Sequence, residues 1–214
     1  GKYLVCLPDL SGAIDTLANL RGTERLLLDL YDRPETVVEA AASINKRWQR
    51  VFELMYDTIT SHGNGVTTWV SAWSAETYIL PTCDFNYMIG EEHFRKLCLP
   101  SLVEQARMGG RCVLHIDGPH AIKHARAVAE TPEITVAQFT PGAGTPSAAV
   151  WMDTWHMLQE AGKPLALACP AEEVSKLCAE LDPRGLMMMA QGVRNVSEAQ
   201  ELEEIVRGYG RRKR

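Results

Sequence analysis

The sequence has no long apolar run and no targeting signal. Its apolar stretches, such as residues 164–169, are far shorter than the roughly 20 residues that a membrane-spanning helix requires. The first residues include neither a starting Met nor the charged, apolar and small-residue regions of a signal peptide. We therefore expect a chain that makes no contact with a membrane and that begins inside a domain.

The sequence also lacks closely paired cysteines and an excess of positive charge. No two of its six cysteines form a CxxC pair, and this scattered usage favours reduced thiols in the cytoplasm. The net charge of -5 gives no general attraction to nucleic acid. The one concentrated basic run, residues 211–214, is expected to be solvated.

What the sequence does contain is a repeated pattern in which an apolar run precedes a helix-like segment. The apolar runs predict strands over residues 3–7, 66–70, 112–116, 134–139, 165–169 and 186–190. Such runs are typical of parallel strands, because both faces of a parallel sheet are covered. Helices are expected over residues 34–62, 91–108 with a kink at Pro100, 119–130, 147–161, 171–181, and 197–209 with a cap at Ser197.

This βα pattern fits an α/β fold, which could be either a doubly wound sheet or a parallel barrel. The motifs and the length of the chain distinguish the two. A doubly wound sheet is disfavoured because no G-x-G-x-x-G motif follows the first apolar run. A parallel β/α (TIM-type) barrel of eight units typically has about 250 residues. We therefore expect one domain over residues 1–214, the C-terminal portion of a barrel, with about six of the eight βα units present. Its open edges predict either a homodimer that covers them or a marginal monomer.

In a parallel barrel the active face lies at the C-terminal ends of the strands, so polar residues just after each apolar run are the candidate site residues. These are Asp9, Ser11, Ser71, Trp73, His115, Asp117, Gln138, Cys169 and Gln191, with Cys83, Asp84 and Asn86 in the long loop after the second run.

The sharpest of these patterns is His115-Ile116-Asp117. Residues two apart on a strand point to the same side, so the imidazole and the carboxylate can meet one ligand. Such a pair suits a divalent ion such as zinc, or proton transfer. The alternative is that Asp117 caps the helix expected after Gly118-Pro119 and that His115 is a satisfied core histidine.

Four stretches resemble the uroporphyrinogen decarboxylase superfamily, which holds tetrapyrrole decarboxylases and zinc-dependent methyltransferases that work with corrinoid proteins and thiols. They are LDLYDRPE (residues 28–35), CDFNYMIG (residues 83–90) leading to Phe94 and Leu99-Pro100, HIDGP (residues 115–119) and QFTPGAG (residues 138–144). In this order they are more similar to the uncharacterised, methyltransferase-like branch than to the haem-pathway enzymes.

The sequence departs from both known activities of that superfamily at its metal and substrate motifs. The methyltransferases carry a His-x-Cys pair where this chain has His115 and Asp117, and a further cysteine near the last strand where it has Gln191. The Gly-His-Gly of the decarboxylases is also missing, because Gln191-Gly192-Val193 stands in its place. Asp117 would then supply oxygen in place of sulfur, with Cys83 or Cys169 as a further metal ligand.

The resemblance implies a methyltransferase-like enzyme that acts on a small methylated substrate with a thiol or corrinoid-protein partner. His115, Asp117 and Asp84 would carry the chemistry, with zinc as the implied metal. The expected substrate-binding residues are Trp73, Ser71, Gln138, Gln191 and Asn86. Two alternatives stay open: a decarboxylase of a tetrapyrrole or other acidic ligand, and a non-catalytic barrel that binds a ligand or a corrinoid protein.

Overall fold

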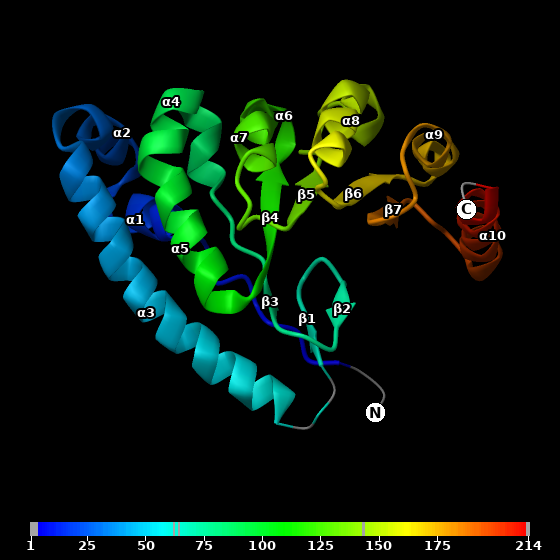
Figure 1. Cartoon of the computed structure of the whole chain (residues 1–214), viewed down its shortest axis with the longest axis horizontal. Coiled ribbons are helices and arrows are strands. Elements are labelled where there is room, and N and C mark those ends of the chain that lie inside the picture. Colours follow the sequence, from blue (N-terminus) through cyan, green and yellow to red (C-terminus); the bar gives the residue numbers. More distant parts are fainter. Residues whose placement is uncertain (1–3, 62, 64, 143, 213–214) are drawn as a thin grey trace. The chain divides into compact units, whose positions relative to one another are not determined.

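The chain divides into two compact units, and the division falls inside one strand. The computed structural model describes residues 4–61, 63, 65–142 and 144–212 (Figure 1). The first unit comprises Gly1–His115 with Thr131–Thr135, and the second comprises Ile116–Glu130 with Val136–Arg214. Whether the chain is a single domain, as expected from its composition, stays a prediction.

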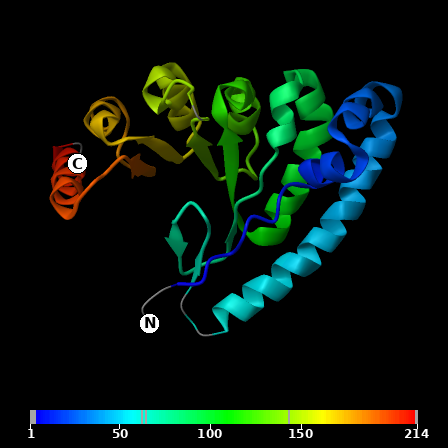
Figure 2. The ribbon, with the colours of Figure 1, turned by 180° about the vertical axis from the view of Figure 1, so that it is seen from behind.

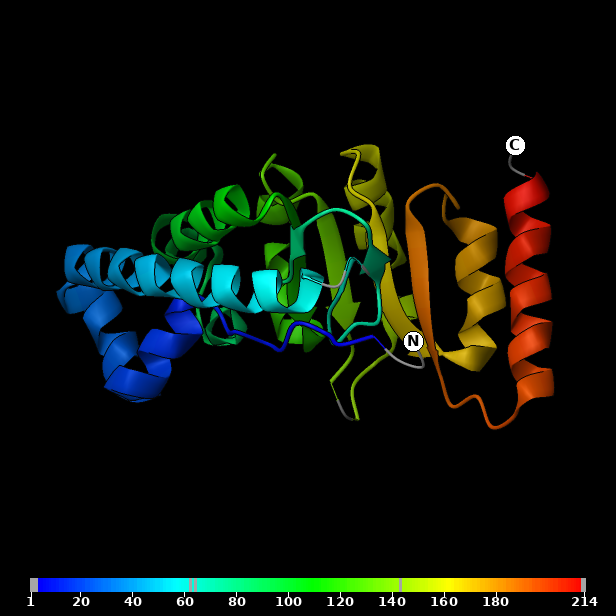
Figure 3. The same cartoon turned by 90° about the horizontal axis from the view of Figure 1, so that it is seen from below.

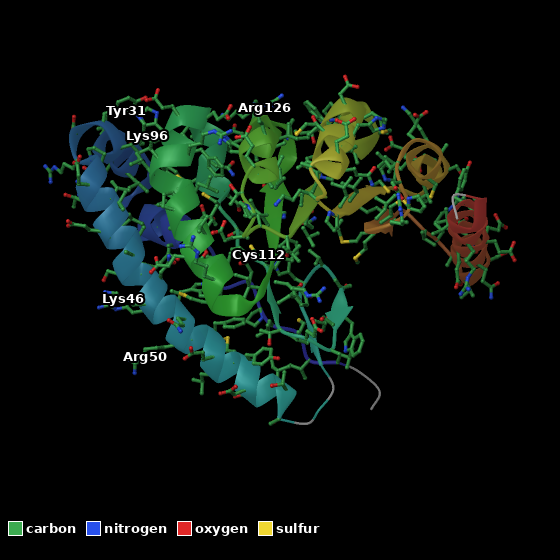
Figure 4. All side chains as sticks on the ribbon, in the orientation of Figure 1. Tyr31, Lys46, Arg50, Lys96, Cys112 and Arg126 are labelled. Atoms are coloured by element: carbon green, nitrogen blue, oxygen red, sulfur yellow. The ribbon has the colours of Figure 1, made fainter. Side chains whose placement is uncertain are left out.

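The first unit is built around helix α3 (Pro34–Thr60), which confirms the helix expected from residue 34. Proline suits the first turn of a helix because its missing N–H would have no partner there. One face of α3 is buried through Val37, Ala41, Trp48 and Phe52, whereas Lys46 and Arg50 point outward (Figure 4). Two helices that the sequence analysis did not predict, α1 (Ala13–Arg21) and α2 (Thr23–Asp32), contact α3 near its start (Figure 2).

The helix expected over residues 91–108 is present with an irregularity before Pro100. It begins as α4 (Glu91–His93), passes through a π-helical turn (Phe94–Cys98) and continues as α5 (Leu99–Gly109). Proline cannot donate a backbone hydrogen bond, and its ring clashes with the carbonyl four residues earlier. The wider π turn relieves this clash, so the helix continues through the proline.

Helix α5 carries a buried polar side chain, Gln105, that predicts a stabilising substitution. Gln105 is fully buried, and neither amide atom has a hydrogen-bond partner in the part of the chain that the structure describes. An unsatisfied buried amide costs about 1–3 kcal/mol. We expect Gln105→Met, which keeps the length of the side chain, to raise the free energy of unfolding in urea by about 1–2 kcal/mol.

The control for this prediction is Gln200→Met on the exposed side of the last helix, where we expect almost no change in stability. A loss of stability in Gln105→Met would contradict the prediction and would indicate a buried water that satisfies the glutamine.

The strands of the first unit differ from those expected. Strand β1 (Val66–Thr67) covers only the start of the expected 66–70 strand and pairs antiparallel with β2 (Trp73–Ser74). The expected 3–7 strand is reduced to a single parallel bridge between Leu7 and Thr68, with Tyr3 outside the described residues. A strand that was not predicted, β3 (Tyr78–Ile79), pairs in parallel with β4 (Arg111–Asp117). The two N-terminal strand predictions were therefore largely wrong, because an apolar run shows neither its pairing partner nor, as the exposed Leu4 and Val5 show, that it is buried.

The second unit follows the sequence closely. Strands β5 (Val136–Thr140), β6 (Leu165–Pro170) and β7 (Leu186–Gln191) pair in parallel. The residues of the middle strand, β6, are almost all buried. The helices that follow the strands are α6 (Gly118–Ala121), α7 (Ala125–Ala129), α8 (Met152–Glu160), α9 (Val174–Glu180) and α10 (Val196–Arg212). Helices α9 and α10 lie side by side (Figure 3). The predicted cap at Ser197 is wrong, because Asn195 Oδ1 accepts the Glu198 N–H at 3.0 Å.

Together the strands give an α/β fold with a five-stranded parallel sheet in the order β3-β4-β5-β6-β7. This sequential order is the one that consecutive βα units have in a parallel barrel. The complete barrel stays a prediction. Among the described residues, no helix combines the length and apolar character needed to cross a bilayer.

Candidate metal centre

Three of the predicted catalytic side chains come together at the end of strand β4. One ligand atom each from Asp84, His115 and Asp117 lies within 4.8 Å of the others. His115 and Asp117 reach the same place because side chains two apart on a strand share a face. Asp84 belongs to the 3-10 helix Asp84–Met88, in the segment that follows β3. The expected grouping of His115 with Asp117 is therefore present, and Asp84 joins it.

His115 is the buried member of the group, with 7% of its surface exposed. Its backbone N–H donates to the Pro81 carbonyl at 3.1 Å, which fixes the strand against the segment that leads to Asp84. Its ring lies edge-on to Trp69, with centroids 4.9 Å apart and planes at 83°. The first contact fixes the backbone and the second orients the imidazole, while Asp84 and Asp117 stay exposed to water.

Asp84 is held in place by a residue that the sequence analysis missed, Asp15 in the first turn of α1. The Asp15 carboxylate accepts the backbone N–H of Asp84 at 2.9 Å and that of Phe85 at 2.8 Å. It also accepts the Thr82 hydroxyl at 3.0 Å. These three bonds cap the start of the 3-10 helix from outside, as an N-cap side chain would. The only signal in the sequence was an aspartate in a segment not expected to be helical.

The structure disfavours the alternative assignment of Asp117 as the cap of the next helix. Asp117 is the N-cap residue of α6 by position, but its side chain makes no capping hydrogen bond. Helix α6 has four residues and starts with Gly118-Pro119, where the absent proline N–H reduces the need for a cap. The carboxylate of Asp117 is instead placed with His115 and Asp84.

Cys83, predicted as a further metal ligand, lies next to Asp84 in the chain but outside the group that has ligand spacing among the described residues. A hydrogen bond with Cys98, together with burial, raises the pKa of the Cys83 thiol well above its usual value. Burial and the nearby Glu173 likewise raise the pKa of Cys169 to about 11. Both thiols are therefore protonated at neutral pH in the metal-free chain, and a metal ion would have to displace the proton to bind either one.

The other predicted binding residues are dispersed over the two units. Ser71 is exposed, has a left-handed backbone with φ of 60°, and follows β1, while Trp73 is exposed in β2. Asn86 is buried in the 3-10 helix that begins at Asp84. In the second unit, Gln138 is buried in β5 and donates to Thr140 Oγ1 at 2.9 Å, and Gln191 is exposed at the end of β7.

The burial of the cysteines predicts a simple pattern of thiol reactivity. Cys6 is exposed, and the other five cysteines are buried in the folded chain. Since thiol reagents attack exposed thiolates, we expect one thiol per chain to react rapidly with Ellman's reagent at pH 8 and six after unfolding. The variant Cys6→Ser should show no rapid reaction. Rapid reaction of a second thiol in the wild type would contradict the buried positions.

The raised pKa of Cys169 also makes the free energy of unfolding depend on pH. The unfolded chain ionises this thiol near the usual pKa of about 8.5, whereas the folded chain keeps it protonated up to about pH 11. Unfolding therefore releases a proton between these values, and this thiol lowers the free energy of unfolding as the pH rises through them.

No protein-family model, no curated protein and no solved structure matches this chain. The four sequence stretches and the geometry of Asp84, His115 and Asp117 are therefore the basis for a functional proposal. The stretches carry a resemblance only, and the geometry carries the chemistry that the site can support.

Proposed function

We propose that this chain is part of a uroporphyrinogen decarboxylase-superfamily enzyme that binds a divalent metal ion and transfers a methyl group from a small methylated substrate. A thiol or a corrinoid protein is the proposed second partner, and a parallel β/α barrel is the proposed complete fold. The observation that carries the proposal is the convergence of Asp84, His115 and Asp117 within 4.8 Å. The four stretches that resemble the superfamily support the choice of methyl transfer.

The donor set fits zinc. Zinc is held by imidazole nitrogen at about 2.0–2.1 Å and by carboxylate oxygen at about 2.0–2.2 Å. In tetrahedral coordination two such ligand atoms are about 3.4 Å apart, so atoms that lie within 4.8 Å would have to approach one another by up to about 1.4 Å, through side-chain rotation. Three protein ligands leave one coordination position open, which is characteristic of catalytic rather than structural zinc. Asp117 supplies oxygen at the position where the methyltransferases have a cysteine.

In this proposal the side chains of the chain hold the ion and control protons. His115 would offer one ring nitrogen to the ion, and the packing of its ring against Trp69 sets the ring orientation in advance. A bound divalent ion supplies stabilisation of a thiolate at neutral pH. A proton released from the thiol would reach water by way of the carboxylates of Asp84 and Asp117, which are exposed. The thiolate sulfur then bonds to the methyl carbon, while the methyl carrier leaves with the bonding electron pair.

The test begins with metal content and affinity. Elemental mass spectrometry on untagged protein should find one divalent ion per chain, with zinc the expected ion. In titrations of the metal-free protein, His115→Ala should weaken zinc binding by more than about 100-fold. Replacing a residue that only hydrogen-bonds to a metal ligand lowers metal affinity by about 10–100-fold, and losing the ligand itself should lower it further. The control is His93→Ala, whose ring contacts Tyr31 rather than the metal group. Metal-free wild type that also fails to bind zinc at micromolar concentration would overturn the proposal.

A second measurement separates metal binding from methyl transfer. Metal-loaded protein is mixed with methylcobalamin and 2-mercaptoethanol, and loss of the methyl-cobalt bond is followed by absorbance. We expect catalysed loss that depends on His115, Asp84 and Asp117. Tight zinc binding without any transfer to the thiol would favour the non-catalytic barrel over the methyltransferase.

A further inference from the structure

Helices α1, α2 and α3 enclose a small groove that is separate from the metal group. Its lining, here called the helical groove, consists of Leu17, Arg21, Leu26, Asp29, Arg33, Thr36, Val37 and Ala40. These helices contact one another in the first unit (Figure 2). The floor is apolar, since Leu26 and Val37 are almost fully buried, while Thr36 and the two arginines are exposed and Asp29 is half-buried.

The charges around the helical groove do not cancel. Arg21 binds Asp29 through two bonds, Nε to Oδ2 at 2.6 Å and Nη2 to Oδ1 at 3.2 Å. This pairing holds the pKa of Asp29 below its usual value, and the more distant charge of Arg33 acts in the same direction. Within the described residues, the side chain of Arg33 makes no hydrogen bond or ion pair, and only its backbone is hydrogen-bonded. The groove therefore carries one guanidinium in excess of its carboxylate.

A buried apolar floor beside an uncompensated guanidinium is complementary to a ligand with an apolar body and an anionic head. Arginine is well suited to this role because its planar fork can donate two parallel hydrogen bonds to one carboxylate. We propose that the helical groove binds a small amphipathic carboxylate, with the carboxylate on Arg33 and the hydrocarbon against Leu17, Leu26 and Val37.

The volume of the groove limits the ligand to a short one. It is about 270 Å³, slightly below the roughly 300–1,000 Å³ of sites for drug-sized molecules. A ligand of about ten non-hydrogen atoms with ordinary efficiency binds with a Kd in the millimolar range. Octanoate, with a seven-carbon hydrocarbon chain and one carboxylate, has ten non-hydrogen atoms and is a suitable probe.

The experiment compares octanoate with octan-1-ol and octylamine by ligand-observed saturation-transfer NMR on the full chain. We expect millimolar binding of octanoate, at least 5-fold weaker binding of octan-1-ol, and no binding of octylamine. In Arg33→Gln, octanoate should bind about 10-fold more weakly and lose its preference over octan-1-ol. The matched control is Arg25→Gln, an exposed arginine of α2 outside the groove, which should bind octanoate as the wild type does.

Three outcomes would overturn the proposal. The first is equal binding of octanoate and octan-1-ol by the wild type. The second is unchanged octanoate binding in Arg33→Gln. The third is no binding by the wild type at an octanoate concentration 20-fold above a Kd of about 1 mM. Far-UV circular dichroism of both variants checks that they fold. Because the groove shares no residue with Asp84, His115 and Asp117, the result is independent of metal binding.

Discussion

Replacing Gly12 with alanine is expected to destabilise the first unit strongly, because no space exists for even one methyl group. A Cβ at Gly12 would lie 1.9 Å from the carbonyl oxygen of Thr82 and 3.1 Å from its carbonyl carbon. Both are backbone atoms, so the clash can be relieved only by moving the chain. The Gly12 N–H also donates to Thr82 Oγ1 at 3.1 Å, and this bond would be lost with the movement.

We expect Gly12→Ala to lower the free energy of unfolding by about 2–4 kcal/mol, as overpacking against a rigid neighbour does. Because the displaced segment leads to Asp84, metal retention should fall as well. Urea unfolding and zinc titration of the same variant would measure both effects.

Gly90 provides a matched control. Gly12 and Gly90 both precede helices in extended conformations, with φ and ψ of -84° and 161° for Gly12 and of -76° and 167° for Gly90. Neither position needs a left-handed backbone, so the conformational effect of alanine is the same. A Cβ at Gly90 would meet nothing within 4 Å. Equal stability of the Gly12→Ala and Gly90→Ala variants would contradict the close approach of Gly12 to Thr82.

The second large effect is expected for Asp15→Ala, which removes the acceptor of three hydrogen bonds at once. Bonds to a charged acceptor contribute about 1.5–3 kcal/mol each when buried, and those made by Asp15 are partly exposed. We expect a loss of about 2–4 kcal/mol in the free energy of unfolding. Zinc affinity should fall by at least about 10-fold, which is the loss typical of mutating a residue that orients a metal ligand without binding the metal itself.

Two comparisons distinguish the positioning role of Asp15 from a general helix effect. Asp153→Ala removes an exposed first-turn aspartate from α8, a helix of nine residues like α1. It should change stability by less than about 1 kcal/mol, the size of a charge–dipole interaction. If Asp15→Ala loses stability but binds zinc as tightly as the wild type, Asp15 supports the fold without orienting Asp84.

Much of the sheet could be predicted from the sequence, and the reason lies in parallel pairing. Strands β4 to β6 are largely buried and β7 is partly buried, and each appears as a short continuous apolar run between turn residues. Strand β3 has only two residues, and nothing in Tyr78–Ile79 itself shows that it pairs with β4. The run at residues 66–70 is equally apolar, yet its strand belongs to a two-stranded antiparallel pair.

By itself the sequence determined that the segments now seen as β4 to β7 alternate with helices, and that His115 and Asp117 share one face of a strand, since a strand has a period of two residues. Only the tertiary structure decided that Asp84 completes the group and that Cys83 does not. Asp84 is placed by Asp15, which is 69 residues away in the chain, and Cys83 is buried outside the group that has ligand spacing. Contacts of this kind depend on how α1 packs, which no local pattern of residues records.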